Sequence, residues 1–198
     1  MAIVSKISHS FQYCKRMFKT HLLLSNTAST MCLLGIGDSL SQHIEIRLTN
    51  KWNHNLTQDS HSVVQNYDLI RTIKVASVGS LTGPFLHNWY LFLDKKYPFK
   101  NPKSIIKKML LDQLLAAPLL NILFITAIHT LDGKHLKQIY ETFKEKLLTI
   151  YAYDCMIWPL CQFINFYFIP NVYRLLYINF ISVLWNALLS FLMFNDID

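Results

Sequence analysis

The side chains that could do chemistry in this 198-residue chain lie within or beside long apolar stretches. Asp38 and Gln42 are four residues apart, so they would share one face of a helix. His87 and Asp94 are two turns apart and would share a face of a second helix. Ionisable groups in apolar surroundings pair with one another or face a wet interior. The candidate polar residues are Asp38, Gln42, Arg71, His87, Asp94, Asp112, Gln113, Gln162, Asn165 and Arg174.

Two interpretations of these residues stay open. Either they line a polar pathway through a helical bundle, or they form ion pairs between its helices. In the second case Asp38, Asp94 and Asp112 would bond to Arg71, Arg174 or lysines where the helices leave the apolar region. The ion-pair interpretation is slightly favoured, because an unpaired charge in apolar surroundings is costly.

Signatures of catalysis and of cofactor binding are weak in this sequence. Gly35-Ile36-Gly37-Asp38 matches the G-x-G-D element of intramembrane aspartyl proteases, which need a second carboxylate from a Tyr-Asp pair to share a proton. Tyr67-Asp68 and Tyr153-Asp154 follow that element here, whereas the pair precedes it in those proteases. We therefore expect no enzymatic activity, no catalytic residue and no cofactor, with an aspartyl protease as a remote alternative. No metal site is expected either, because metal-ligand spacing is missing among Cys14, Cys32, Cys155 and Cys161.

The distribution of charge indicates the elements that must position these residues. Only 16% of the residues are charged, against about a quarter in soluble domains, and 52% are hydrophobic. Five runs of at least 18 residues contain no Asp, Glu, Lys or Arg, and about 20 apolar residues cross a bilayer as a helix. The sequence therefore predicts an all-α, polytopic transmembrane helical bundle with four or five spans; the alternative is a soluble all-α protein with a large core. The runs are Thr20–Gly37, Val75–Leu93, Gln113–Leu131, Cys155–Tyr173 and Leu175–Asn195.

Glycines and prolines inside these runs indicate how the helices pack. Gly79 and Gly83 have the G-x-x-x-G spacing that lets two helix backbones approach each other in lipid. Gly35 and Gly37 close the first run, and we expect all four glycines to lie at helix-packing seams. A proline inside a helix removes a backbone hydrogen bond and kinks the helix. The expected kinks are at Pro84, Pro118 and Pro159.

Charged segments lie between the runs and divide the chain. Residues 1–20 are basic, contain serines and lack acidic residues, which is typical of a mitochondrial transit segment and also of a positively charged membrane flank. We expect a single helical transmembrane domain over 21–195, with a polar connection at 45–67. The formal charge of +7 is concentrated in the leader and in one Lys-rich segment. That segment is a candidate basic contact patch made of Lys95, Lys96, Lys100, Lys103, Lys107 and Lys108.

Several of these pieces recur in a fixed order along most of the chain. Over residues 22–192 they resemble the Mpv-17 / peroxisomal membrane protein family of small polytopic organelle proteins, and within it the Mpv-17-like protein 2 branch. Each motif is short, and it is their order and spacing that carries the resemblance. The motifs are Gly35-Ile36-Gly37-Asp38 with Gln42, Arg71-Thr72, Gly83-Pro84-Phe85-Leu86-His87-Asn88-Trp89-Tyr90, Leu93-Asp94, Asp112-Gln113 with Pro118, Trp158-Pro159 with Gln162 and Asn165, and Trp185-Asn186.

The resemblance implies a multi-pass protein of the mitochondrial inner membrane, with the peroxisomal membrane as the alternative. Family members are associated with non-selective pores, and the like-protein-2 branch with assembly of the mitochondrial ribosome and with mitochondrial translation. The resemblance thus implies two functions that use different residues. A ribosome-supporting protein would contact the large subunit through the basic patch, whereas a channel would use the interior polar face. The expected partners are the lipid bilayer, the large ribosomal subunit and further copies of the same chain.

Overall fold

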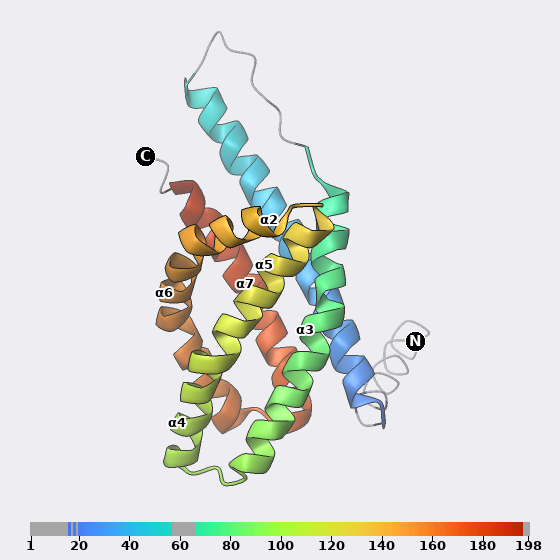
Figure 1. The fold of residues 1–198 in the computed structure, drawn as a ribbon, viewed down its shortest axis with the longest axis vertical. Coiled ribbons are helices and arrows are strands. Elements are labelled where there is room, and N and C mark those ends of the chain that lie inside the picture. Colours follow the sequence, from blue (N-terminus) through green and yellow to red (C-terminus); the bar gives the residue numbers. More distant parts are fainter. Residues whose placement is uncertain (1–15, 17, 19, 57–65, 196–198) are drawn as a thin grey trace, which may run out of the picture.

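The computed structural model describes residues 16, 18, 20–56 and 66–195 (Figure 1). The regular elements of this part are all helices, so the all-α prediction is confirmed. A π-helical turn, η1, joins α4 to α5, and a short 3-10 turn, η2, joins α6 to α7. The elements are α2 (Leu22–Leu56), α3 (Leu69–Lys96), α4 (Pro102–Leu111), η1 (Asp112–Ala116), α5 (Ala117–Leu131), α6 (Leu136–Phe168), η2 (Asn171–Tyr173) and α7 (Arg174–Asn195).

Each of the five charge-free runs falls largely within its own helical segment: α2, α3, η1 with α5, α6, and α7. Within the described residues, one helical stretch has the length and composition to cross a membrane by those two criteria alone. That stretch is Pro102–Leu131, which α4, η1 and α5 form together. The number of spans stays a prediction.

The helices pack as a bundle in which α2 lies against both α3 and α7 (Figure 1). The chain turns at the foot of α3, and α4 and α5 then run back along it, with contacts between α3 and α5. Helix α6 packs on α5 and α4 and leads through η2 into α7. An apolar cluster near the foot of the bundle joins α3, α4, α6 and α7, and it includes Leu93, Ile105, Phe166 and Leu175.

The surface of this bundle is more apolar, and its interior more polar, than in a soluble protein. Large apolar side chains face outward, among them Ile70, Met156 and Leu160, which are 66%, 75% and 66% exposed. Polar side chains are buried, and Asn165 and Arg174 are 0% and 2% exposed. Soluble proteins bury such groups rarely, whereas helices in lipid turn them toward one another. The packing therefore agrees with a helical membrane protein.

The predicted polar connection at 45–67 is partly helical, because α2 continues to Leu56. No glycine or proline occurs between Gly37 and the start of α3, so nothing in the sequence breaks the helix after its apolar run ends. Helix α3 starts at Leu69, where the side chain of Asp68 accepts a hydrogen bond from the Arg71 backbone N–H at 2.9 Å. Apart from residues 16, 18 and 20, the predicted leader lies outside the described residues.

The prolines lie in helices, and one of them accompanies a change of helix type. Pro84 is inside α3 and Pro159 inside α6, while Pro118 is in the first turn of α5. Immediately before Pro118, the Ala117 N–H bonds the carbonyl of Asp112, five residues back. A proline ring clashes with the carbonyl four residues earlier, and the wider π turn gives that carbonyl room.

Two glycines of α3 allow close contact between the backbones of α2 and α3. A Cβ atom added to Gly79 would lie 2.7 Å from Met31 Cα, and one added to Gly83 would lie 2.9 Å from Thr27 Cα. Carbon atoms do not approach so closely, so only glycine fits at either position. The contacts of Gly35 and Gly37 are looser, since an added Cβ would come no nearer than 3.3 Å to Ala76 Cβ or Asn186 Nδ2.

We predict that replacing Gly83 by Val lowers the free energy of unfolding by about 1–3 kcal/mol, because the added side chain must push α2 away from α3. The matched control is Ser80→Val, which adds bulk to an exposed position of the same helix and should change stability little. Unfolding of the detergent-solubilised protein by SDS, followed by tryptophan fluorescence, measures both. Equal effects of the two variants would contradict close packing at Gly83.

Candidate functional site

Asp38 is the centre of a polar cluster between α2 and α3. Its carboxylate is 5% exposed and accepts three hydrogen bonds. Oδ1 accepts from Arg71 Nε at 2.9 Å, and Oδ2 accepts from Thr72 Oγ1 and Gln42 Nε2, both at 2.7 Å. The two donors from α3 and the one from α2 join the helices through this carboxylate and fix the rotation of α2 relative to α3.

The same cluster ties down the start of α3. Gln42 Nε2 donates to the Asp68 carbonyl at 3.0 Å, and Gln42 Oε1 accepts from the Asp68 backbone N–H at 2.7 Å. Arg71 reaches further, to both carboxylate oxygens of Glu45 at 2.9 and 3.2 Å. One side chain of α2, Gln42, thus bonds both the N–H and the carbonyl of the residue just before α3.

A second cluster closes the opposite end of the bundle. Asp94 Oδ1, at the end of α3, pairs with Arg174 at the start of α7 and with Lys108 Nζ of α4 at 2.6 Å. Arg174 also donates from Nε to the Ile169 carbonyl at 3.2 Å. Phe166 lies beneath both cations, with its ring centroid 5.3 Å from the Arg174 guanidinium and 5.6 Å from Lys108 Nζ. These contacts join α3, α4, α6 and α7 at one point.

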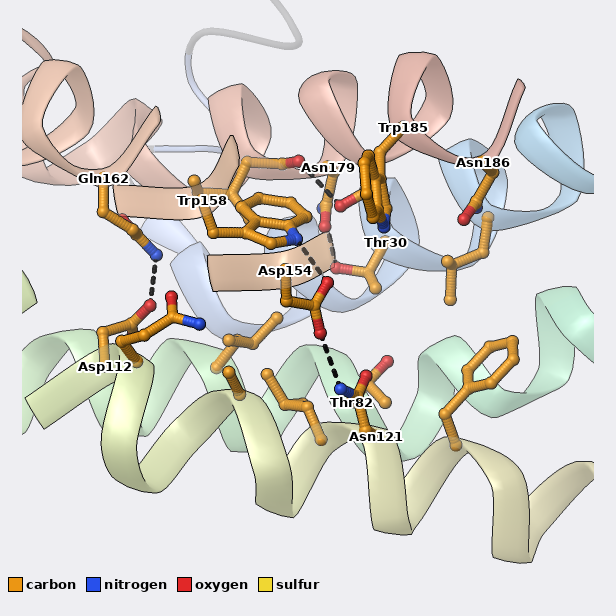
Figure 2. A pocket seen from close by; sticks show the side chains of 18 of the residues that line it. Thr30, Thr82, Asp112, Asn121, Asp154, Trp158, Gln162, Asn179, Trp185 and Asn186 are labelled. Atoms are coloured by element: carbon orange, nitrogen blue, oxygen red, sulfur yellow. Dashed lines mark hydrogen bonds between the residues drawn. The ribbon is translucent and has the colours of Figure 1, made fainter. Parts of the chain in front are cut away.

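Between the two clusters lies a central cavity of about 280 Å³, with a wall made by α2, α3, α5, α6 and α7 (Figure 2). Leu34, Leu86, Phe124 and other apolar side chains form much of the lining. The polar side chains and indole rings that face it include Thr30, Thr82, Asp112, Asn121, Asp154, Trp158, Gln162, Asn179, Trp185 and Asn186.

Asp112 and Asp154 are the acidic residues of the cavity, and hydrogen bonds hold both in place (Figure 2). Asp112 accepts from Trp89 Nε1 at 2.8 Å and from Gln162 Nε2 at 2.5 Å. Asp154 accepts from Asn121 Nδ2 at 2.7 Å and from Trp158 Nε1 at 2.9 Å. The donors are all neutral, and no described Lys or Arg forms an ion pair with either carboxylate.

Further buried pairs connect α2 to its neighbours near the cavity. Asn26 Nδ2 donates to His87 Nδ1 of α3 at 2.9 Å, and Asn179 Nδ2 of α7 donates to Thr30 Oγ1 at 2.8 Å. Asn165 donates to Gln162 Oε1 at 2.9 Å, while its own buried Oδ1 has no hydrogen-bond partner among the described residues. These contacts make the interior a polar network that extends over several helices.

Some of the candidate polar residues predicted from the sequence form ion pairs between helices, and others line the central cavity. Asp38 with Arg71, and Asp94 with Arg174, are ion pairs. Asp112 differs, because its partners are a tryptophan and a glutamine rather than a cation. Gln113 also faces the cavity, donates to Cys155 Sγ at 3.3 Å and accepts from Tyr151 through its carbonyl. Of the remaining predicted residues, Gln42 belongs to the Asp38 cluster and Gln162 donates to Asp112. Asn165 donates to Gln162, and His87 forms a hydrogen bond with Asn26.

The prediction of the basic contact patch was wrong for one residue. Lys108 is 5% exposed and is turned inward to Asp94, because α4 packs this face against α6 and the apolar cluster. Its side chain is therefore inaccessible to a macromolecular partner. The other five lysines of the patch remain exposed: Lys95, Lys96, Lys100, Lys103 and Lys107.

Sequence reasoning did not single out several residues of the cavity. Asp154 was considered only as part of a Tyr-Asp pair, and Asn121 was not among the candidate polar residues. The Asp154-x-x-x-Trp158 spacing, four residues on one helical face, was the available signal. Trp185 was noted only as part of a family motif, and Asn179 lies in a nearly charge-free helix without a spacing pattern of this kind.

Among the described residues, no group of three His, Cys, Asp or Glu side chains is placed to hold a metal ion. Outside the spans, Lys74 Nζ bonds Asp132 Oδ1 at 2.6 Å and lowers the pKa of that carboxyl. The hydrogen bonds and ion pairs described above hold helices together and enclose a polar cavity.

Comparison with known proteins gives consistent matches. Residues 129–190 match the model of the Mpv17 / PMP22 family. PXMP2/4 family protein 4 of Dictyostelium discoideum is 33% identical over 156 residues, which are 78% of this chain and 77% of the relative. Mitochondrial inner membrane protein Mpv17 of Xenopus laevis is 32% identical over 89% of this chain and 92% of its own length. Protein SYM1 of Candida albicans is 32% identical over 88% of this chain and 91% of its own length. No solved structure matches.

Two acidic residues that bind the same arginine give a direct test of the Asp38 cluster. Asp38→Asn places an amide N–H₂ among three donors, so we expect a loss of about 1–3 kcal/mol in the free energy of unfolding. Glu45 is 22% exposed, and Glu45→Gln should cost less than about 1 kcal/mol. SDS unfolding of both variants measures the difference. A Glu45→Gln loss as large as that of Asp38→Asn would show that burial does not set the contribution of the pair.

Proposed function

Because the chain belongs to the Mpv17 / PMP22 family, we propose that it provides a pathway for small polar solutes, cations above all, across its membrane. The protein resides in the mitochondrial inner membrane, as do the relatives that carry this location in their names. The observation that carries the proposal is the central cavity with Asp112 and Asp154 in its wall.

The electrostatics of the cavity favour a cationic solute. A carboxylate between membrane helices is costly unless a cation or a proton neutralises it. Neutral donors hold Asp112 and Asp154, so they orient the carboxylates without cancelling a negative charge. A cation that enters the cavity would supply the missing charge.

The lining also suits passage rather than tight capture. Amide groups of Gln162, Asn121 and Asn179 can replace part of the hydration shell of a solute. Much of the remaining wall is apolar, including the indole of Trp185, which is 7% exposed. A few polar groups in a largely apolar wall bind a solute weakly enough for it to leave.

We predict that Asp112→Asn and Asp154→Asn lower the cation-to-anion permeability ratio of the reconstituted protein by at least about threefold each, because each removes a negative charge from the cavity. Reversal potentials in planar bilayers under a salt gradient measure the ratio. The matched control is Glu141→Gln, which removes an exposed acidic group of α6 and should leave the ratio unchanged.

A wild-type protein that stays electrically silent over a wide voltage range would contradict the pathway. If the protein conducts but Asp112→Asn and Asp154→Asn keep the wild-type cation-to-anion permeability ratio, as the control does, the role of the two cavity carboxylates is contradicted.

A second candidate function is support of mitochondrial ribosome assembly and translation, which the exposed part of the basic patch favours. These lysines surround the turn between α3 and α4: Lys95 and Lys96 end α3, Lys100 lies in the turn, and Lys103 and Lys107 are in α4. The acidic group of this turn, Asp94, is already bound to Lys108 and Arg174 and does not offset them. Ribosomal RNA attracts such clusters through its phosphates.

Changing these five lysines to Gln should lower cosedimentation of the solubilised protein with the large ribosomal subunit by more than about tenfold at physiological salt, since each phosphate contact adds to the affinity. The control changes Lys134, just before α6, and Lys137, in its first turn. Both lysines are exposed and lie at the end of the bundle opposite the turn between α3 and α4. Cosedimentation that survives loss of the five lysines would contradict this second candidate.

A further inference from the structure

A groove on the outside of the bundle runs between α2 and α3 and shares no lining residue with the central cavity. It has a volume of about 720 Å³ and follows α2 from Met31 to Arg47. Small residues let the two helices meet beneath it, since a Cβ added to Gly35 would lie 3.3 Å from Ala76 Cβ. Ile36 and Leu40 of its lining are 56% and 41% exposed. The groove is therefore apolar along most of its length and open to the surrounding lipid.

A single formal charge lies in the lining of this groove, the guanidinium of Arg47 at one end. Arg71 nearby is bound by Asp38 and Glu45, but Arg47 forms no ion pair or hydrogen bond with any other described residue. His43, one turn before it, bonds the Ser39 carbonyl through Nδ1 at 2.7 Å. An exposed cation that no described residue neutralises, at the end of an apolar groove, is suited to an anionic group attached to an apolar chain.

The length of the groove matches one leaflet of a bilayer. The sixteen helical steps from Met31 to Arg47 rise by about 24 Å. Half of the hydrocarbon core of a bilayer is about 15 Å thick, and a headgroup layer adds roughly 5–7 Å. A chain lying along the groove would therefore bring its headgroup to the height of Arg47.

We propose that this groove binds one anionic phospholipid, with its phosphate on Arg47 and an acyl chain along the floor beside Gly35 and Ala76. The binding does not depend on the solute pathway. A second copy of the chain fits less well, because the same groove would bring a second Arg47 and no acidic lining residue to neutralise either cation.

Native mass spectrometry of the full chain in mild detergent tests the proposal, with phosphatidylglycerol and phosphatidylcholine of equal chain length as probes. We expect one phosphatidylglycerol to remain bound in preference to phosphatidylcholine, and Arg47→Gln to weaken its binding about fivefold. The control is Lys134→Gln, which makes the same charge change at an exposed position by the same end of the bundle and should keep wild-type binding.

A second variant tests the seat of the acyl chain. Ser39→Phe fills the middle of the groove and should weaken binding of phosphatidylglycerol and phosphatidylcholine alike, with helical content by circular dichroism as the check on folding. Glycerol phosphate, which has the phosphate but no chain, should fail to displace the lipid even at millimolar concentration.

Three results would overturn the proposal. Equal binding of the two lipids to wild type, or equal weakening by Arg47→Gln and Lys134→Gln, would remove the role of Arg47. Displacement by glycerol phosphate alone would show a phosphate site without a lipid seat. A lipid-free dimer that Ser39→Phe converts to monomer would identify a second copy of the chain as the occupant.

Discussion

Carboxylates buried between helices, each needing a donor from another helix, are the constraint on which this bundle depends. In lipid the apolar surface gives no net drive for helices to associate, so specific contacts must hold them. Asp38 fixes α2 to α3, and Asp94 gathers α3, α4 and α7. Two glycines then let α2 and α3 touch, which brings the donors within reach. Polar pairing and close packing therefore require each other.

The central cavity follows from that frame. The clusters hold the two ends of the bundle, and between them the π turn before Pro118 begins at Asp112, which lies in the cavity wall. Asp154 reaches the same space from α6, a helix that brings Trp158 and Gln162 on one face. Cations neutralise the carboxylates at the ends and neutral donors hold those in the middle. This difference separates residues that join helices from residues that can meet a solute.

The sequence predicted the helices well because long runs without charge have one stable form in a membrane, and a fixed 3.6-residue repeat places Asp38 above Gln42. It also named Asp38 and Asp94, with Arg71 and Arg174, as candidates for interhelical ion pairs, but not which residue pairs with which. It failed where the answer depended on which helices are neighbours. Lys108 was grouped with exposed lysines because nothing local shows that α4 turns it toward Asp94. Asp112 was expected to meet a cation, yet the donor from α6 is Gln162. The extension of α2 to Leu56 was missed because the polar residues after position 45 were interpreted as a connection between helices.

The central claim is that the polar face of each helix lines a water-accessible interior while its apolar face meets lipid. Nitroxide labels on two cysteine variants of α7 in a cysteine-free background, reconstituted in bilayers, test it most directly. Ser182 lines the cavity, and Leu184, two residues on, is 51% exposed on the outer surface. Because both positions lie at nearly the same depth, the account predicts frequent collisions with a water-soluble nickel chelate at Ser182→Cys and with oxygen at Leu184→Cys. Equal collision rates with the two reagents at both positions would contradict it.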